Sequence, residues 1–353
     1  MWNEEALSFL QALIEAPSPS GFERRGQQQW GNFVKRYADS VESDAYGNQW
    51  AVLEGTDPDA PSVMLEAHAD EIGFMVRYID EKGFIYITRI GGTDRAIVRS
   101  KRVRILGDKG EVIGVTGNVA IHLRDTKEDK IPEWHELYID IGASSREEVH
   151  ERGIRVGHPA VFADSVEEIG AYRLAGRALD NRIGGFMVAM ALRSLAQKRP
   201  KGTVYVVNAV QEEIGGYGAR MVAYRLHPSR ALVTDVTHAT DSPGIDPKEH
   251  GEVKLGGGPT LTHGSANHPE LVALLERIAE EEGVSVQHEA TSTRTGTDTD
   301  DIFTVRGGIP SVLLSLPMRY MHSTVEMIDK RDVEACVTLM ERFAHRVSED
   351  GAS

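Results

Sequence analysis

The sequence predicts an α/β fold: a mixed open sheet flanked by helices, with a small β-barrel inserted into it. Helical patterns alternate with apolar runs of valine, isoleucine and leucine at both ends of the chain. Such runs, without polar alternation, are typical of strands that are covered on both faces. From Gly73 to about Phe162 the pattern changes to short β-type runs separated by glycine-rich turns. We therefore expect an α/β unit formed by residues 1–70 and 164–353, and an inserted β-rich unit of residues 71–163.

Two helices and two strands are expected before the insertion. The first helix runs from about residue 3 to 15, because Leu7, Leu10 and Leu13 share one helical stripe. It ends at APSPSG, where two prolines prevent continuation. A second helix follows from about Phe22, and the strands are NQWAVLEG and the apolar start of SVMLEAHADEIGFMVRYID.

Helices and strands alternate again after the insertion. The expected helices are NRIGGFMVAMALRSLAQ, ARMVAYRL, HPELVALLERIAEEEG and a C-terminal one from about Asp329. The expected strands are TVYVVNAVQ, RALVTDV and IPSVLLSL. The single cysteine, Cys336, shares a helical stripe with Val333, Val337 and Met340, so a buried core thiol is expected rather than a nucleophile.

Composition excludes several classes of function. Lysine and arginine total 39 and aspartate and glutamate total 54 in 353 residues, which gives a formal charge of −15. A nucleic acid or an anionic membrane surface would be repelled by that field. No apolar stretch approaches the roughly 20 residues of a membrane-spanning helix. The first residues, MWNEEALSFL, are acidic where a secretory signal is basic, and one cysteine fits a reducing compartment. We expect a cytoplasmic protein.

Standard catalytic motifs are missing, but acids and histidines follow the ends of four predicted strands. These residues are His68 with Asp70 and Glu71, Glu212 with Glu213, Asp235, and His322, while Asp180 stands where a helix begins. Taken singly, each has an ordinary explanation: Asp180 caps a helix, and the paired glutamates form a solvated turn. Ligands of open α/β sheets bind at the carboxyl ends of the strands. Four strands that each deliver such a residue to one edge therefore indicate a site.

This donor set indicates metal chemistry. Mixed histidine and carboxylate ligands suit Zn²⁺, Co²⁺ or Mn²⁺ better than Ca²⁺ or an iron–sulfur cluster. Five ligands with few histidines are too many for one tetrahedral zinc. They fit two metals about 3.5–4 Å apart that share a carboxylate and a water.

The segments around these residues resemble the TET-type metallo-aminopeptidases, which include glutamyl, leucyl and deblocking aminopeptidases. The similarity runs nearly end to end, through PSPSGFE, AHADEIGFMV, LYIDIGA, ALDNRIGG, VQEEIGGYGAR, LVTDV and RYMHSTVEMID. The resemblance implies an enzyme that releases N-terminal amino acids from peptides with a free N-terminus. It also implies two divalent metal ions per subunit, with Zn or Co favoured over Mn.

The resemblance implies a role for each site residue. His68 and His322 would be terminal ligands, one for each metal, and Asp180 would bridge the two. Glu213 would complete the site of one metal and Asp235 that of the other. Glu212 would be the general base that takes a proton from the water between the metals, and Asp70 would hold the ring of a histidine ligand. Neighbours on an extended chain point in opposite directions, so a bend is expected at Glu212–Glu213.

The resemblance further implies that the β-rich insertion pairs subunits into dimers, and that dimers assemble into a hollow tetrahedral dodecamer. Two segments depart from the family pattern. In TRTGTDTDDIF, Asp300 and Asp301 are extra acids; solvation is the favoured reading, but an acid facing the pocket would select a basic substrate side chain. The glycines of LGGGPTLTHGSANHP are expected either to let backbone approach the substrate or to form a plain loop. Neither His263 nor His268 in that segment has an expected role.

Three alternatives remain open at this stage. One is another dinuclear zinc hydrolase, a carboxypeptidase or an amidohydrolase acting on N-acyl amino acids, against which ALDNRIGG and QEEIGGYG argue. A glycosidase could use Glu212 and Asp235 as its paired carboxylates, but it would leave His68 and His322 without a function. A metal-storing shell protein is a non-enzymatic reading, and it would not need Glu212.

Overall fold

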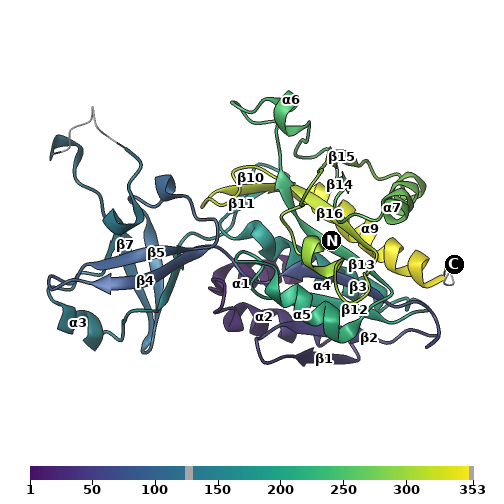
Figure 1. The fold of residues 1–353 in the computed structure, drawn as a ribbon, viewed down its shortest axis with the longest axis horizontal. Helices are drawn as coiled ribbons and strands as arrows, with labels where there is room; N and C mark the ends of the chain where they lie inside the picture. The colour runs from purple at the N-terminus through teal and green to yellow at the C-terminus, as the bar shows by residue number, and fades with distance from the viewer. Residues whose placement is uncertain (124–129, 350–353) are drawn as a thin grey trace.

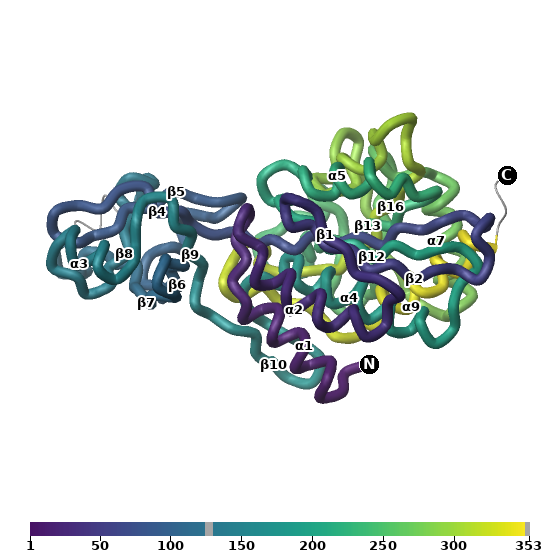
Figure 2. The backbone as a smooth tube through the Cα atoms, turned by 90° about the horizontal axis from the view of Figure 1, so that it is seen from below, coloured from purple at the N-terminus to yellow at the C-terminus, as the bar shows by residue number. Residues whose placement is uncertain are grey.

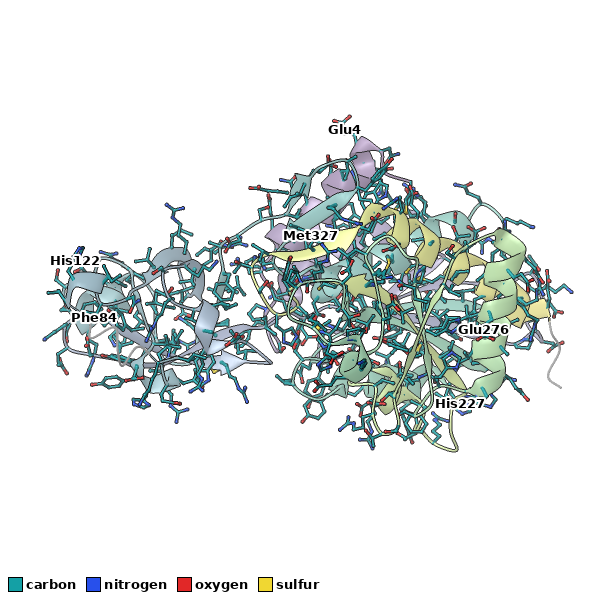
Figure 3. The ribbon with its side chains drawn as sticks, turned by 90° about the horizontal axis from the view of Figure 1, so that it is seen from above. Glu4, Phe84, His122, His227, Glu276 and Met327 are labelled. Carbon is teal, nitrogen blue, oxygen red and sulfur yellow. The ribbon has the colours of Figure 1, made fainter. Side chains whose placement is uncertain are left out.

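The computed structural model describes residues 1–123 and 130–349, so the parts of the two predicted units at 124–129 and 350–353 lie outside it. The molecule is elongated, with a β-barrel that projects from one end of a larger α/β body (Figure 1). Phe84 and His122 mark the barrel in Figure 3, whereas Glu276 and His227 lie toward the opposite end of the molecule. None of the described helices is long and apolar enough to cross a bilayer.

Eight strands of the described chain form one mixed sheet in the order β1-β2-β12-β3-β13-β16-β14-β15. Their bounds are β1 Ser40–Ser43, β2 Gln49–Leu53, β3 Val63–His68, β12 Val204–Ala209, β13 Arg230–His238, β14 Thr260–His263, β15 Gln287–Ala290 and β16 Ser311–Met318. The four central strands β12, β3, β13 and β16 are parallel to one another, while β2 and β14 run antiparallel to their central neighbours. The predicted mixed open sheet is confirmed.

Helices cover both faces of this sheet, which is why its central strands are mostly apolar. One face packs against α1 Glu4–Glu15, α2 Arg24–Val34, α4 Leu179–Leu195, α7 Pro269–Glu282 and α9 Lys330–Glu349. The other packs against α5 Tyr217–Leu226 and the short α8 Thr299–Ile302. Figure 2 shows α1, α2, α4 and α9 on one side of the strands and α5 on the other. The predicted helices are therefore confirmed, and Cys336 is fully buried in α9 as expected.

The inserted segment folds into a closed barrel in the order β4-β5-β8-β7-β6-β9. Its strands are β4 Gly73–Ile79, β5 Ile85–Ile90, β6 Arg102–Gly107, β7 Gly110–Thr116, β8 Tyr138–Asp140 and β9 Pro159–Phe162. Alternate residues such as Phe74, Val76, Ile85 and Ile87 point inward and form a core separate from that of the sheet. The predicted inserted β-barrel is confirmed.

Short or polar elements were not anticipated from the sequence. They are α3 Arg146–Glu151, α6 Pro247–His250, α8, β1, β14, β15, and a small sheet of β10 Glu167–Ile169, β11 Arg173–Gly176 and β17 Glu326–Asp329, with 3₁₀ turns at Arg95–Ile97, Ile121–Leu123 and Trp134–Glu136. The three residues of β10 are all exposed, and β15 has no fully buried residue. Without a buried face, neither strand carries an apolar pattern that sequence reasoning can detect.

Candidate active site

The carboxyl ends of the four central strands bring the predicted site residues together. His68 is the last residue of β3 and Asp235 lies in β13. Glu212 and Glu213 come shortly after β12, and His322 comes shortly after β16. Because these strands are parallel neighbours, their side chains meet at one edge of the sheet, as the sequence predicted.

Five of the side chains form two groups that share Asp180. The Nε2 atom of His68 lies 3.2 Å from Asp180 Oδ1 and 3.6 Å from Asp235 Oδ1. The Nε2 atom of His322 lies 3.3 Å from Asp180 Oδ2 and 3.4 Å from Glu213 Oε1. Asp180 therefore presents one carboxylate oxygen to each histidine. All five side chains, and that of Glu212, line one cavity of about 780 Å³.

The backbone departs from regular structure at several of these positions. The Asp180–Asn181 peptide bond is cis, and Ala178, Gln211 and His322 have φ angles of 54°, 63° and 58°. Left-handed conformations of this kind cost non-glycine residues on the order of 1–3 kcal/mol each, and they concentrate at functional sites. At Gln211 the turn redirects the chain just before the two glutamates. The bend expected there is confirmed, and both carboxylates reach the same cavity.

Asp70 holds the parts of the site in place. It is fully buried, and its Oδ1 atom lies 3.4 Å from Nδ1 of His68. Its carboxylate also accepts hydrogen bonds from the backbone N–H groups of Glu212 and Glu213, at 3.0 and 3.1 Å. The hydroxyl of Ser20, in the PSPSGFE turn, donates to it at 2.5 Å. One carboxylate thus fixes a histidine ring, the glutamate turn and the N-terminal segment.

Glu326 is a site residue that sequence reasoning missed. Its carboxylate is buried and accepts hydrogen bonds from the backbone N–H of His322 at 3.0 Å and from that of Asp180 at 3.1 Å. Glu326 therefore links the segment that carries Asp180 to the segment that carries His322. The available signal was its position in the apolar run VEMID, where an acid without a partner would be costly.

A second missed group lies beneath the site. Glu66 precedes His68 by two residues on the same face of β3 and is fully buried. Burial raises its pKa to about 8, against the opposing effect of the equally buried Asp298. Burial and the charge of Glu66 raise the pKa of Asp298 well above its usual range. Burial therefore favours the neutral form of both carboxyls over two charges.

The electrostatics of the cavity call for added positive charge. Burial opposes protonation of His68 and His322, yet the surrounding carboxylates raise both pKa values, that of His322 to about 11. Burial raises the pKa of Glu213 to about 7 and that of Glu212 well above its usual range. Buried carboxylates thus outnumber the two imidazoles that could neutralise them. A divalent cation would supply the missing charge.

The donor atoms also fit metal ions by geometry and chemistry. Ligands at about 2.0–2.2 Å in a tetrahedron lie about 3.3–3.6 Å from one another, close to the separations in both groups. The buried Oε1 atom of Glu213 has no hydrogen-bond partner among the described residues. Imidazole nitrogens combined with carboxylates suit Zn²⁺, Co²⁺ and Mn²⁺. The residues present are therefore able to hold two cations that share Asp180.

The loop before α8 also lines the cavity, and the two extra acids, Asp300 and Asp301, lie in α8 directly after it. Asp300 is only 5% exposed and accepts hydrogen bonds from the backbone N–H groups of Thr295 and Gly296. The expectation that it is solvated is wrong, because it stabilises the loop. Asp301 lines the cavity together with Arg294, so the solvated reading fails for it as well.

The glycine run does not approach the cavity, so that expectation is wrong too. The backbone N–H groups of Gly256 and Gly258 donate to the carboxylate of Asp332 at 2.7 and 2.9 Å. At Gly258, a Cβ atom would lie 1.8 Å from the carbonyl oxygen of Ser285. The glycines are needed for close packing against the start of α9 and the segment before β15.

An open α/β sheet whose parallel strands deliver two histidine–carboxylate groups to one cavity is the framework of a metal-dependent hydrolase. Residues 47–339 match the family model described as M42 glutamyl aminopeptidase. The chain belongs to the M42 family, and it is a metal-dependent aminopeptidase. The resemblance stated from the sequence is confirmed.

Individual relatives agree with this assignment. The lysyl aminopeptidase of Pyrococcus furiosus is 35% identical over 336 residues, which cover 94% of each chain. An aminopeptidase structure from the archaeon Desulfurococcus kamchatkensis has a TM-score of 0.91 at 33% identity, covering 99% of this chain and 96% of that one. The TET1 peptidase of Pyrococcus horikoshii, which can assemble into a tetrahedron or a large octahedral shell, has a TM-score of 0.85 at 29% identity and covers 96% and 99%.

Proposed function

We propose that this chain uses two divalent cations, which share Asp180 as a ligand, to remove N-terminal residues from peptides. The observation that supports it most strongly is the arrangement of the carboxylate of Asp180, with one oxygen 3.2 Å from His68 and the other 3.3 Å from His322. The first cation would be held by His68, Asp180 and Asp235, and the second by Asp180, Glu213 and His322. When bound, such a pair polarises the scissile carbonyl and lowers the pKa of the attacking water.

Glu212 is the proposed general base. Its carboxylate lines the cavity, and Oε2 lies 3.8 Å from Nε2 of His68, outside both ligand groups. Burial raises its pKa well above the usual range, which makes the carboxylate a better proton acceptor. In the proposed mechanism Glu212 takes the proton of the attacking water and then gives it to the leaving amine. Asp70 acts only by positioning, because it lies behind His68 and the glutamate turn.

The position of Asp301 in the cavity supports a preference of the enzyme for substrates with a basic N-terminal side chain. It is partly exposed and lines the cavity, where a lysine or arginine side chain of the substrate could pair with it. Burial raises the pKa of Asp301, and the charge of Arg294, which also lines the cavity, opposes that rise. The P. furiosus relative is named a lysyl aminopeptidase, which agrees with this proposal.

The barrel is proposed to pair subunits, so the chain divides into a catalytic unit of residues 1–70 and 164–353 and a contact unit of residues 71–163. Apolar side chains stand exposed on β7 and on the segment that follows it: Ile113, Val115, Val119, Ile121, Leu123 and Ile131. Exposed apolar groups of this size mark contact surfaces. Dimers assembling into a tetrahedral dodecamer are the proposed state, and replacing Ile121 and Leu123 by glutamate would lower the mass measured by light scattering.

The identity of the metal and the cellular location are also proposals. Zn²⁺ and Co²⁺ are the preferred cations and Mn²⁺ is acceptable, because all three take imidazole and carboxylate ligands. A cytoplasmic location agrees with a single cysteine that is buried and unpaired.

Hydrolysis of aminoacyl-p-nitroanilides tests the proposal. Metal-free protein is compared with protein given Zn²⁺, Co²⁺ or Mn²⁺, and N-acetylated substrates serve as controls. We expect metal-dependent cleavage of unblocked substrates alone, fastest for lysyl and arginyl compounds. Cleavage of acylated substrates alone would instead indicate an amidohydrolase, and activity that persists in chelator would contradict the two-metal proposal.

A further inference from the structure

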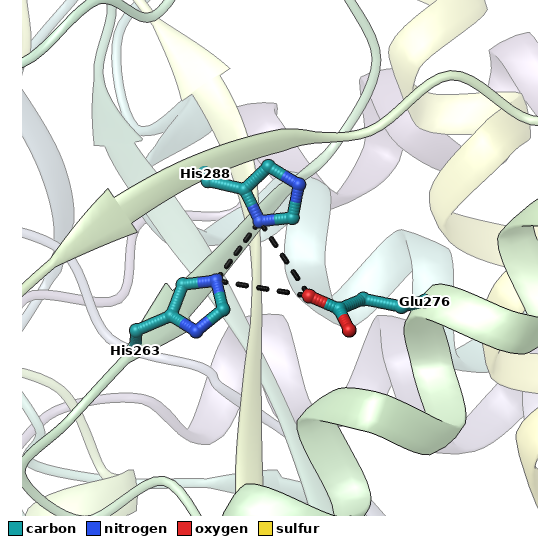
Figure 4. Close-up of side chains that lie close together, drawn as sticks. All are labelled: His263, Glu276 and His288. Carbon is teal, nitrogen blue, oxygen red and sulfur yellow. Dashed lines mark hydrogen bonds and ion pairs between the residues drawn. The ribbon is translucent and has the colours of Figure 1, made fainter.

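A second group of metal-binding side chains lies outside the active-site cavity. His263 ends β14, His288 lies in the edge strand β15, and Glu276 lies on α7, which packs against β14. Figure 4 shows the two rings and the carboxylate pointing toward one another. We propose that these three residues form a further binding site for a divalent transition-metal ion, one that does not depend on the proposed function of the active site.

The fold brings the three side chains together in a regular way. In the parallel pair β14–β15, His288 stands opposite Leu261, so His263 and His288 are diagonal neighbours on the same face. Leu261 on that face packs in the same core as Leu271 and Leu275 of α7. Glu276 follows Leu275 directly, and its position at the edge of the helix places its carboxylate over the two rings.

The distances fit a single cation. The Nε2 atom of His263 and the Nδ1 atom of His288 are 2.9 Å apart, and each lies 3.9 Å from Oε1 of Glu276. Around a zinc ion with ligands at about 2.0–2.2 Å, tetrahedral neighbours would be about 3.3–3.6 Å apart, so shifts of a few tenths of an ångström complete the site. Two imidazoles and one carboxylate select Zn²⁺, Ni²⁺ or Cu²⁺ over Ca²⁺ or Mg²⁺.

Solvent can complete the coordination. The side chains of His263, His288 and Glu276 are 45%, 51% and 42% exposed, so an ion can enter and retain water as a further ligand. Without an ion, a hydrogen bond between the two rings accounts for their short separation. That bond requires one ring to donate and the other to accept, whereas a cation uses the lone pairs of both nitrogens.

An ion at this position would fix β15 relative to α7. Glu289, adjacent to His288, points to the other face of the strand and accepts hydrogen bonds from Thr262 at 2.5 Å and from Thr237 at 2.7 Å. Thr237 lines the active-site cavity, and the loop with Arg294 that leads into α8 begins just after β15. The proposed ion therefore connects an edge strand to a helix next to the segment that forms the substrate pocket.

Zinc content tests this site. Chelator-treated protein is dialysed to equilibrium against buffered Zn²⁺, and bound zinc is measured for wild type, His263→Gln, His288→Gln and His250→Gln. His250 is the matched control, because its ring is also exposed and lies 3.7 Å from Glu249, with no third ligand among the described residues. We expect His263→Gln and His288→Gln to bind about one equivalent less than wild type, with His250→Gln unchanged. Aminopeptidase turnover should stay at the wild-type rate in all three variants, which also shows that they fold.

A thermal melt gives a second readout. Because an ion that binds only the folded state stabilises it, Zn²⁺ should raise the Tm of wild type more than that of His288→Gln. Equal zinc content in wild type, His263→Gln and His288→Gln would overturn the proposal. An equal loss in His250→Gln would overturn it as well, since binding would then be a general property of surface histidines.

Discussion

Replacing Glu212 by glutamine separates proton transfer from metal binding. The amide has the shape of the carboxylate, and Glu212 lies outside both ligand groups, so we expect unchanged metal content. A positioned general base contributes about 10²–10⁴ in rate, which corresponds to about 2.7–5.4 kcal/mol of transition-state stabilisation. We therefore expect kcat for an unblocked aminoacyl-p-nitroanilide to fall by about that factor with little change in KM. Steady-state kinetics and metal analysis on the same preparation measure both quantities.

The matched control is the neighbouring substitution Glu213→Gln. Oε1 of Glu213 lies 3.4 Å from Nε2 of His322 and belongs to one ligand group. This variant should hold less metal, and raising the metal concentration should restore part of its activity. Added metal should not restore Glu212→Gln. A Glu212→Gln protein that keeps wild-type kcat, or one that loses metal as Glu213→Gln does, would refute the assigned roles.

Three further predictions concern residues around the site. Asp301→Asn should lower kcat/KM for lysyl relative to leucyl p-nitroanilide by about fivefold, which is equivalent to about 1 kcal/mol for a partly exposed ion pair. Equal effects on both substrates would contradict an ion pair between Asp301 and the lysyl side chain. Asp70→Asn should weaken metal affinity or activity by about 10–100-fold, as metal titration will show, because Asp70 holds His68 and the glutamate turn. Burial raises the pKa of Glu66 from 4.5 to about 8, so this residue contributes stability that is present below pH 4.5 and lost as pH rises through about 8. In metal-free protein, the Tm of Glu66→Gln should therefore fall less than that of wild type between pH 4.5 and about 8. Parallel plots of Tm against pH for the two proteins would contradict this prediction.

The positions of the ligands could be predicted because they follow long apolar strands. His68 ends a strand that is buried on both faces, Asp235 lies in the second half of another, and His322 follows a third. Such strands have a clear pattern. Parallel neighbours then place their carboxyl ends together without further information. The bend before Glu212 could be predicted as well, because two adjacent carboxylates reach one cavity only if the strand ends.

Other features could not be read from the sequence because they depend on contacts between distant segments. Glu326 hydrogen-bonds to the backbone of Asp180, 146 residues away along the chain. Glycines look alike whether they approach a substrate or another segment of the protein. Only the fold shows that Gly258 packs against Ser285. His288 lies in an edge strand without a buried residue, so nothing in the local pattern paired it with His263.

The claim that two cations share Asp180 can be tested with crystals soaked in Zn²⁺ or Co²⁺. Diffraction is measured at the absorption edge of the metal. We expect two anomalous peaks per chain about 3.5–4 Å apart, one beside each oxygen of Asp180. One peak should lie next to His68 and Asp235, and the other next to Glu213 and His322. A single peak in the cavity, or two peaks that are not bridged by Asp180, would contradict it.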